Sequence, residues 1–199
     1  MWGEKLKFNR VANDKTARYI IQSLEIIPPK IKRLVDETGM QIYCFNEGFK
    51  PSTIGLLSPS AAFFDDGRSA NEISAFYAGS NITCLFDEDI YFQVRNNEKA
   101  FSTVLHEYGH AVDRALALKG RSKEWMNSDG DRNIITGWRK GYALDEYAAI
   151  NPREYFAQAF MAYFNNLIGY KPWSYREHTR LELMQKDRNM FDYLKELAR

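Results

Sequence analysis

The sequence predicts a single domain of the α+β class, with helices first, a small mixed β-sheet with an edge hairpin in the middle, and helices last. Three observations lead to this expectation. The chain has 199 residues, the length of one domain, and 45% of them are hydrophobic, which is enough to form a core. Apolar residues recur at helical spacing towards both ends of the chain, and short β-prone runs lie between them.

Two helices are expected before the sheet. Apolar residues at helical spacing over 16–27 predict the first helix, which Pro28 and Pro29 should end. Pro29 is well placed to start a second helix over about 30–38, because proline suits the first helical position. Gly39 is expected to be the C-cap of this second helix.

Short β-prone runs predict the sheet. The run QIYCF at 41–45 is expected to be a strand, and 46–71, which is rich in Gly, Pro, Ser and Asp, is expected to be a loop. Residues 73–77 and 82–87, joined by a turn at 78–81, predict the hairpin.

After the sheet the pattern is helical. A helix is expected over about 98–118. Asn151 and Pro152 should start another that runs to about 166, because asparagine caps helix N-termini and proline suits the first helical position. A last amphipathic helix is expected over about 176–198.

Two connections among these helices are less regular. A polar connection is expected at 122–131, and 138–150 fits either a short helix or an ordered loop. No linker divides the chain. We therefore expect one domain over 1–199, composed of a helical and sheet part, 1–97, and a helical part that carries the candidate site, 98–199.

Composition narrows the class of protein. Lys and Arg number 27 against 26 Asp and Glu, a formal net charge of +1, so neither a nucleic acid nor a membrane surface is an expected partner. No apolar run is long enough for a membrane span. We expect a monomer.

The two cysteines, Cys44 and Cys84, are too few for a disulfide scaffold. Their apolar flanks, IYCF and ITCL, favour two buried thiols, and a single bridge between them is the alternative.

Two of the three histidines, His106 and His110, are four residues apart in a predicted helix. Side chains at this spacing lie on one face of a helix, so both imidazoles can bind one metal ion, and Zn²⁺ is the expected ion. Glu107 lies near enough to reach a water molecule at that ion and to act as a general base. The apolar Val104 and Val112 indicate a buried helix, which argues against two surface histidines.

A catalytic zinc ion takes three protein ligands and leaves one position open. Leu116 occupies the place of a third histidine six residues beyond His110, and His178, in the polar stretch YREHTR, is expected to be a solvated helix residue. The third ligand is therefore expected to be a carboxylate.

Four downstream carboxylates are candidates for this ligand. Asp113 is too close to His110 along the helix and better suits a hydrogen bond or a salt bridge. Glu124 lies in a polar connection, and Glu146 lies in a segment of uncertain structure. Glu154 is favoured, because it lies in the first turn of an apolar helix where a buried carboxylate needs a partner. The alternative is that Glu154 only interacts favourably with the helix dipole.

Tyr147 lies seven residues before Glu154. A phenol near the open position of the metal could donate a hydrogen bond to the oxyanion that forms when water attacks a carbonyl. Tyr142 and Tyr155 fit this role equally well on the sequence alone.

The motif HEYGHAVD, followed about 40 residues later by Y-x6-E and a helix of the form EYFAQAF, resembles the catalytic domain of anthrax lethal factor. It also resembles the small secreted Pro-Pro endopeptidases of clostridia and bacilli, which share that zincin-like fold. The likeness covers about residues 98–166, and AFYAGSNITCLF resembles the strand pair that precedes the active-site helix.

This resemblance implies a zinc-dependent endopeptidase with one Zn²⁺ per chain, bound by His106, His110 and Glu154. It implies Glu107 as the base that activates water and Tyr147 as the residue that stabilises the tetrahedral intermediate. It further implies a peptide or protein substrate, extended along the hairpin near residues 82–86 and rich in proline if the specificity is shared.

The compartment, the substrate and the catalytic role of this protein each have an alternative interpretation. The resemblance implies secretion, but the N-terminus lacks the apolar segment of a signal peptide, so either a mature form or a cytoplasmic protein is expected. The protease could instead be a lethal-factor-like toxin that acts on a specific partner protein. A non-catalytic zinc-binding or peptide-binding module is a further alternative, against which the presence of Glu107 and Tyr147 argues.

Overall fold

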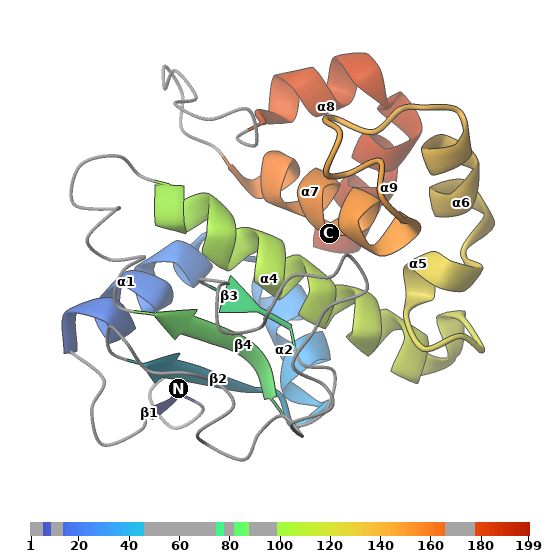
Figure 1. The fold of residues 1–199 in the computed structure, drawn as a ribbon. Helices are drawn as coiled ribbons and strands as arrows, with labels where there is room; N and C mark the ends of the chain where they lie inside the picture. The colour runs from blue at the N-terminus through green and yellow to red at the C-terminus, as the bar shows by residue number, and fades with distance from the viewer. Residues whose placement is uncertain (1–5, 9–13, 46–74, 78–81, 88–98, 166–177) are drawn as a thin grey trace.

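The computed structural model describes residues 6–8, 14–45, 75–77, 82–87, 99–165 and 178–199. Its central element is helix α4 (Lys99–Leu116), which contacts helices α1 and α2 and strands β3 and β4 as well as helix α7. In Figure 1, α4 lies between the strands and the C-terminal helices. The candidate site on α4 is therefore at the junction of these two groups of elements.

Four short strands form the sheet, in the order β1-β2-β4-β3: β1 (Leu6–Phe8), β2 (Gln41–Phe45), β3 (Ala75–Phe76) and β4 (Ile82–Asp87). Strand β2 is parallel to both β1 and β4, and β3 is antiparallel to β4. The antiparallel pair lies where the sequence predicts the hairpin. Because β4 is flanked on both sides, the edge strand on this side of the described sheet is β3, and not β4 as the resemblance implied.

The predicted α+β class is wrong, because the described residues are mostly helical. The strands are only two to six residues long. The prediction overestimated the sheet because it relied on short β-prone runs. The polar connection at 122–131 contains helical residues, which its turn-forming composition did not predict. The predicted loop at 46–71 and turn at 78–81 lie outside the described residues.

The two N-terminal helices agree with the prediction. Helix α1 spans Asp14–Glu25, and α2 spans Pro29–Asp36 with Pro29 in its first turn. Gly39 follows α2 with a φ of 75°, and its amide donates to the carbonyl of Asp36. This left-handed conformation is the one that glycine adopts at a helix C-terminus.

Two short helices lie between α4 and α7. A π-helical turn, Ala117–Arg121, ends α4, and α5 (Asn127–Gly130) and α6 (Arg132–Arg139) follow. The Asp131 side chain caps α6 by accepting hydrogen bonds from the amides of Asn133 and Ile134. The polar residues that predicted a connection therefore include a helix cap.

Helix α7 (Pro152–Phe164) begins as predicted, with the Asn151 side chain accepting from the Glu154 amide at 2.9 Å. All of its residues from 155 to 164 are buried. The predicted last helix is instead two helices, α8 (Arg180–Lys186) and α9 (Arg188–Ala198). The break lies at Asp187, whose side chain caps α9 at Met190 and accepts a hydrogen bond from the Tyr155 hydroxyl.

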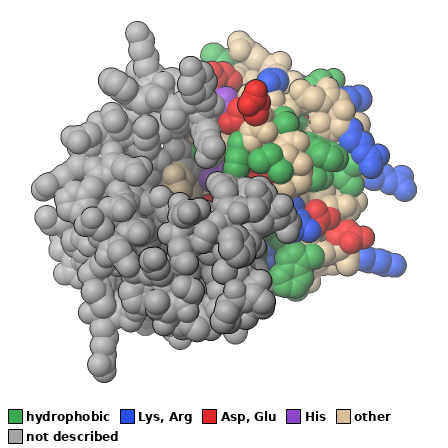
Figure 2. Space-filling model, in the orientation of Figure 1, with side chains coloured by type: hydrophobic (Ala, Val, Ile, Leu, Met, Phe, Trp, Pro, Cys, Tyr) green, Lys and Arg blue, Asp and Glu red, His purple; other side chains and the backbone are tan. Residues whose placement is uncertain are grey.

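None of the described helices is both long and apolar enough to cross a membrane. In the view of Figure 2, acidic and basic side chains lie over the described surface, and histidine side chains show only small areas. His106 and His110 are buried, at 8% and 7% exposed.

Candidate active site

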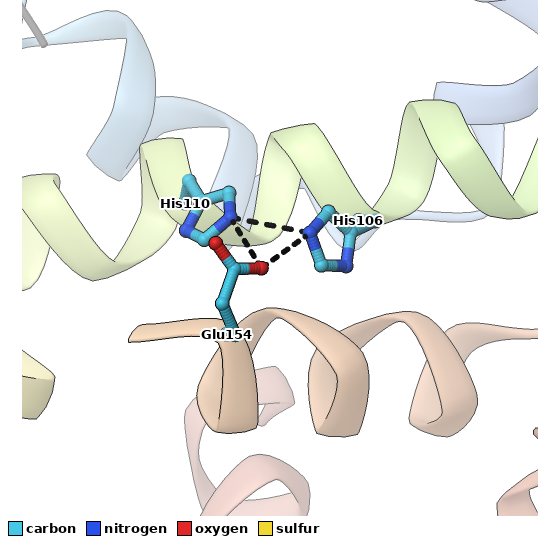
Figure 3. Close-up of side chains that lie close together, drawn as sticks. All are labelled: His106, His110 and Glu154. Atoms are coloured by element: carbon cyan, nitrogen blue, oxygen red, sulfur yellow. Dashed lines mark hydrogen bonds and ion pairs between the residues drawn. The ribbon is translucent and has the colours of Figure 1, made fainter. Parts of the chain in front are cut away.

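Three side chains from two helices converge between α4 and α7 (Figure 3). The Nε2 atoms of His106 and His110 lie 3.2 Å apart. The Oε2 atom of Glu154, from the first turn of α7, lies 3.0 Å from the first of these nitrogens and 3.5 Å from the second. Of the four candidate carboxylates, Glu154 is the one that meets both imidazoles.

This geometry fits a metal ion. Ligand atoms about 2.05 Å from a tetrahedral zinc ion lie about 3.3 Å from one another, close to the three separations observed here. The Oε2 atom of Glu154 is buried and has no hydrogen-bond partner of ordinary geometry among the described residues. A cation at the centre would satisfy this carboxylate oxygen together with both ring nitrogens.

The charge state of Glu154 agrees with this interpretation. Burial by itself raises the pKa of the carboxyl group, but the neighbouring imidazoles of His110 and His106 outweigh burial and lower its pKa. The carboxylate is therefore ionised. Zinc binds neutral imidazoles and an ionised carboxylate, so zinc affinity should fall as the pH is lowered.

Gly109 allows α4 and α7 to approach closely enough to form this centre. A Cβ atom at position 109 would lie 3.1 Å from the Cα of Ala157 and 3.2 Å from the Cβ of Phe160. The first of these contacts is with backbone, which cannot turn aside as a side chain can. The glycine of HEYGH thus fixes the distance between the histidines on α4 and Glu154 on α7.

We expect Gly109→Ala to destabilise the metal-free protein by about 1–3 kcal/mol, because the added methyl group forces α4 and α7 apart. Alanine is otherwise the better helix former by about 1 kcal/mol, so the sign of the effect is informative. Urea unfolding in the presence of a chelator measures it. Stabilisation by this substitution would show that the two helices can separate without cost.

The comparisons with known proteins identify the family. The family model for anthrax toxin lethal factor, N- and C-terminal domain, matches residues 8–197, which is nearly the whole chain. The chain belongs to the anthrax lethal factor family. The resemblance predicted from HEYGHAVD and the downstream Y-x6-E is therefore confirmed.

Structural comparison agrees with this family. The solved structure of the Pro-Pro endopeptidase from Paenibacillus alvei matches with a TM-score of 0.67 and 17% sequence identity, over 98% of this chain and 98% of that one. At this identity the match establishes a shared fold. No curated protein matches the sequence.

Glu107 and Tyr147 are the other two residues that the resemblance implies for the site. Glu107 is 8% exposed and lies between the two histidines in the sequence of α4. The ring of Tyr147 lies 5.7 Å from the ring of His106. Of the other candidate tyrosines, Tyr155 donates its hydroxyl to Asp187, and both burial and that contact raise its pKa, so its phenol is already engaged.

Asp113 lies at the contact between α4 and α5. Its Oδ1 atom accepts from the Ser128 amide at 2.8 Å, and its Oδ2 atom lies 2.5 Å from the Ser128 hydroxyl oxygen. This buried carboxylate therefore joins α4 to α5, in agreement with the predicted hydrogen-bonding role. Burial raises its pKa to about 7, partly offset by the Ser128 hydrogen bonds.

The raised pKa of Asp113 predicts a pH dependence of stability. The folded state holds the Asp113 proton up to about pH 7, whereas the unfolded state releases it near pH 3.8. The contribution of Asp113 is thus largest below the unfolded pKa and is lost as the pH rises through the folded pKa, by up to about 1.4 kcal/mol per pH unit.

Asp113→Asn should remove this loss, because an amide can accept from the Ser128 amide and donate to its hydroxyl. Between pH 5 and pH 7.5 the metal-free wild type should lose stability relative to this variant in urea unfolding. Asp192→Asn, at a half-exposed carboxylate that pairs with Arg188, serves as the control and should keep the wild-type dependence on Asp113. Parallel pH profiles for wild type and Asp113→Asn would contradict the raised pKa.

Sequence reasoning missed several residues around the site. The ring of Tyr77 lies 6.2 Å from that of His110, in a stacked arrangement. Gln158, one turn after Glu154 on α7, lies with its Oε1 atom 3.3 Å from the Nδ1 atom of His106. Its position four residues beyond Glu154, on the same helix face, is a signal that could have identified it.

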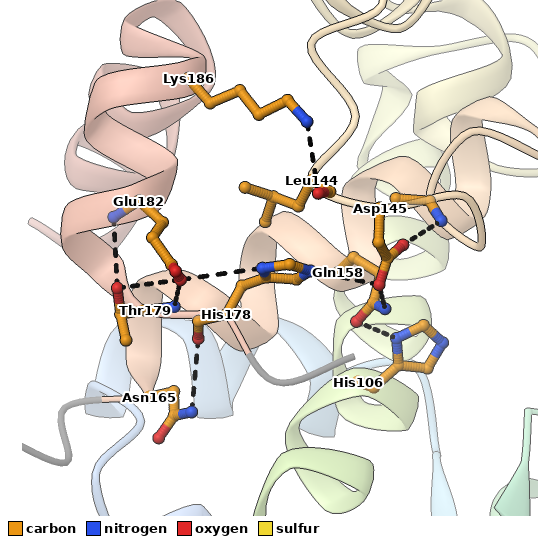
Figure 4. A network of polar contacts seen from close by, with 10 residues as sticks. His106, Leu144, Asp145, Gln158, Asn165, His178, Thr179, Glu182 and Lys186 are labelled. Atoms are coloured by element: carbon orange, nitrogen blue, oxygen red, sulfur yellow. Dashed lines mark hydrogen bonds and ion pairs between the residues drawn. The ribbon is translucent and has the colours of Figure 1, made fainter. Parts of the chain in front are cut away.

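The prediction for His178 also needs correction. Its side chain is 15% exposed, and its Nε2 atom lies 3.2 Å from Oδ2 of Asp145 (Figure 4). The polar sequence around His178 suggested solvent, but the carboxylate partner comes from 33 residues upstream and no local pattern indicates it.

Proposed function

We propose that this chain is a zinc-dependent endopeptidase, which hydrolyses peptide bonds by attack of an activated water molecule. The observation that carries the proposal is the convergence of His106, His110 and Glu154 in a geometry that fits tetrahedral zinc. Two imidazoles and one carboxylate leave one coordination position open, as catalytic zinc requires.

The residues would divide the work as follows. His106, His110 and Glu154 would hold one zinc ion per chain. Zinc in this site would supply Lewis-acid polarisation of the scissile carbonyl and would lower the pKa of the attacking water. Glu107 would take a proton from that water and pass it to the leaving amine. The phenol of Tyr147 would donate a hydrogen bond to the developing oxyanion.

The proposed substrate is a proline-rich peptide bound in an extended conformation. The fold shared with a Pro-Pro endopeptidase supports this choice. The short edge strand β3 offers backbone groups beside Tyr77, whose ring neighbours His110. Backbone pairing at such an edge would give affinity, and side-chain pockets would give sequence preference.

Cleavage of a degenerate peptide library, read by mass spectrometry, tests this function. A proline-containing half and a proline-free half should be digested side by side, with a chelator in one arm and zinc restored afterwards. We expect cuts adjacent to proline that disappear with the chelator and return with zinc. Cuts that persist in the chelator would contradict the metal-dependent mechanism, and cuts in both halves would contradict the proline preference.

If no library peptide is cut, the result would favour the alternative function, that of a toxin-type protease that recognises a folded partner protein. The family model of anthrax lethal factor supports this second candidate. Digestion of native cell extracts followed by N-terminal peptide sequencing separates the two, because a toxin-type protease should cut very few proteins at single positions.

A further inference from the structure

A chain of polar contacts leads from the candidate metal centre to Asp145 (Figure 4). The Nδ1 atom of His106 lies 3.3 Å from Oε1 of Gln158, and Nε2 of Gln158 lies 3.1 Å from Oδ2 of Asp145. Asp145 lies in the segment between α6 and α7 and is 12% exposed at its side chain. The Gln158 amide links this carboxylate to the imidazole of His106.

The polarity of the Gln158 amide follows from Asp145. An ionised carboxylate only accepts hydrogen bonds, so the amide NH₂ of Gln158 must face Asp145 and the carbonyl oxygen must face His106. The Nδ1 atom of His106 then donates its proton to that carbonyl. The proton of a neutral imidazole is thereby held on Nδ1, and the lone pair of Nε2 faces Glu154 and His110.

Asp145 also holds the turn that carries Tyr147. Its Oδ1 atom accepts from the amide of Ala148 at 2.7 Å, and its carbonyl accepts from the amide of Ala149 at 3.1 Å. A carboxylate that accepts from a backbone amide three residues on fixes the start of a turn. The position of the Tyr147 ring and the orientation of the His106 imidazole therefore both depend on the side chain of Asp145.

His178 supports the carboxylate from the opposite side. Its Nε2 atom lies 3.2 Å from Oδ2 of Asp145, and its Nδ1 atom lies 3.7 Å from Glu182. Residue 178 is also held by its backbone, because its carbonyl accepts from the Asn165 side chain at 3.4 Å. Asp145 is thus held by contacts from Gln158 on α7, from His178, two residues before α8, and from its own turn.

We propose that Asp145 is a positioning residue that sets both the metal-binding tautomer of His106, through the Gln158 amide, and the position of Tyr147. This inference rests on the proposed function. It predicts that zinc affinity depends on the Asp145 carboxylate, although it is the neutral amide of Gln158 that connects this carboxylate to the ligand His106.

Asp145→Asn tests the polarity of this relay. The new amide would present NH₂ to the NH₂ of Gln158, so Gln158 would turn over and present NH₂ to His106. Nδ1 of His106 would then accept, and the proton would move to Nε2, where zinc must displace it. We expect zinc affinity to fall about 10–100-fold, measured by competition with a chromophoric chelator. The control is Glu146→Gln, the exposed neighbour in the same turn, which should bind zinc as wild type does.

A double variant distinguishes two effects of Asp145: setting the direction of the hydrogen bonds through residue 158, and supporting the turn that carries Tyr147. Asp145→Asn combined with Gln158→Glu moves the carboxylate to position 158, where it can accept both from the new amide and from Nδ1 of His106. We expect the double variant to recover wild-type zinc affinity within a few-fold. Failure to recover, with the metal-free protein folded by thermal unfolding, would overturn the relay. Wild-type affinity in Asp145→Asn alone would overturn it as well.

Nitrogen NMR of the histidine rings in metal-free protein gives a second readout. We expect Nδ1 of His106 to carry a proton in the wild type and none in Asp145→Asn, and the same state of Nδ1 in both would overturn the inference. A wild type that binds no zinc would contradict the proposed function, while the tautomer would still test the relay. If Asp145→Asn does not fold, Gln158→Met carries the affinity test, because it removes both the acceptor at His106 and the donor to Asp145 and so breaks the relay; unchanged affinity there would overturn the proposal.

Discussion

Glu107→Gln should reduce peptide hydrolysis by about 10²–10⁴-fold while zinc remains bound at one ion per chain. The substitution keeps the size and the hydrogen-bonding shape of a side chain that is only 8% exposed on α4. It removes the basic oxygen that would accept the proton of the attacking water. The measurements are the initial rate of cleavage of the best library peptide and the zinc content of the same sample.

Glu146→Gln is the matched control for this prediction, because it makes the same chemical change at an exposed position near Tyr147. It should leave both rate and zinc content unchanged. Full activity in Glu107→Gln would show that another group serves as the base. Loss of zinc together with activity would place Glu107 among the groups that hold the metal.

Glu154→Gln should weaken zinc binding by more than about 100-fold, beyond the range expected for a residue that only supports a ligand. An amide oxygen is a poorer zinc ligand than a carboxylate, and the charge that offsets the cation is lost. Hydrolysis should fall with the metal. Chelator competition gives the affinity, and added zinc should restore part of the activity.

Asp113→Asn makes the same type of change in a buried carboxylate that contacts Ser128 instead of the imidazoles. It should bind zinc as the wild type does. Equal losses in Glu154→Gln and Asp113→Asn would mean that the metal effect follows from altered packing of α4, and the assignment of Glu154 as the third ligand would be wrong.

Much of the candidate site could be predicted because short sequence patterns indicate where its residues lie. His106 and His110 share a helix face by their four-residue separation, and Asn151 with Pro152 marks the start of the helix that presents Glu154. The approach of the two helices was not predictable. It depends on the absence of a side chain at Gly109, whose partner Ala157 is 48 residues away.

The fold was less predictable for a related reason. The class was wrong because strand-like runs are short, and because polar residues such as Asp131 cap helices as readily as they form loops. The last helix breaks at Asp187, which meets the hydroxyl of Tyr155 from a distant helix. The contact between Asp145 and His178 was not predicted either, because these two residues lie 33 positions apart in the sequence.

Zinc K-edge X-ray absorption, with metal content measured on the same sample, tests the central claim most directly. The account predicts one zinc ion per chain with two imidazole ligands, no sulfur ligand, and the loss of one oxygen ligand or of the metal in Glu154→Gln. A metal-free protein after exposure to zinc, or a zinc ion without two imidazoles, would contradict it.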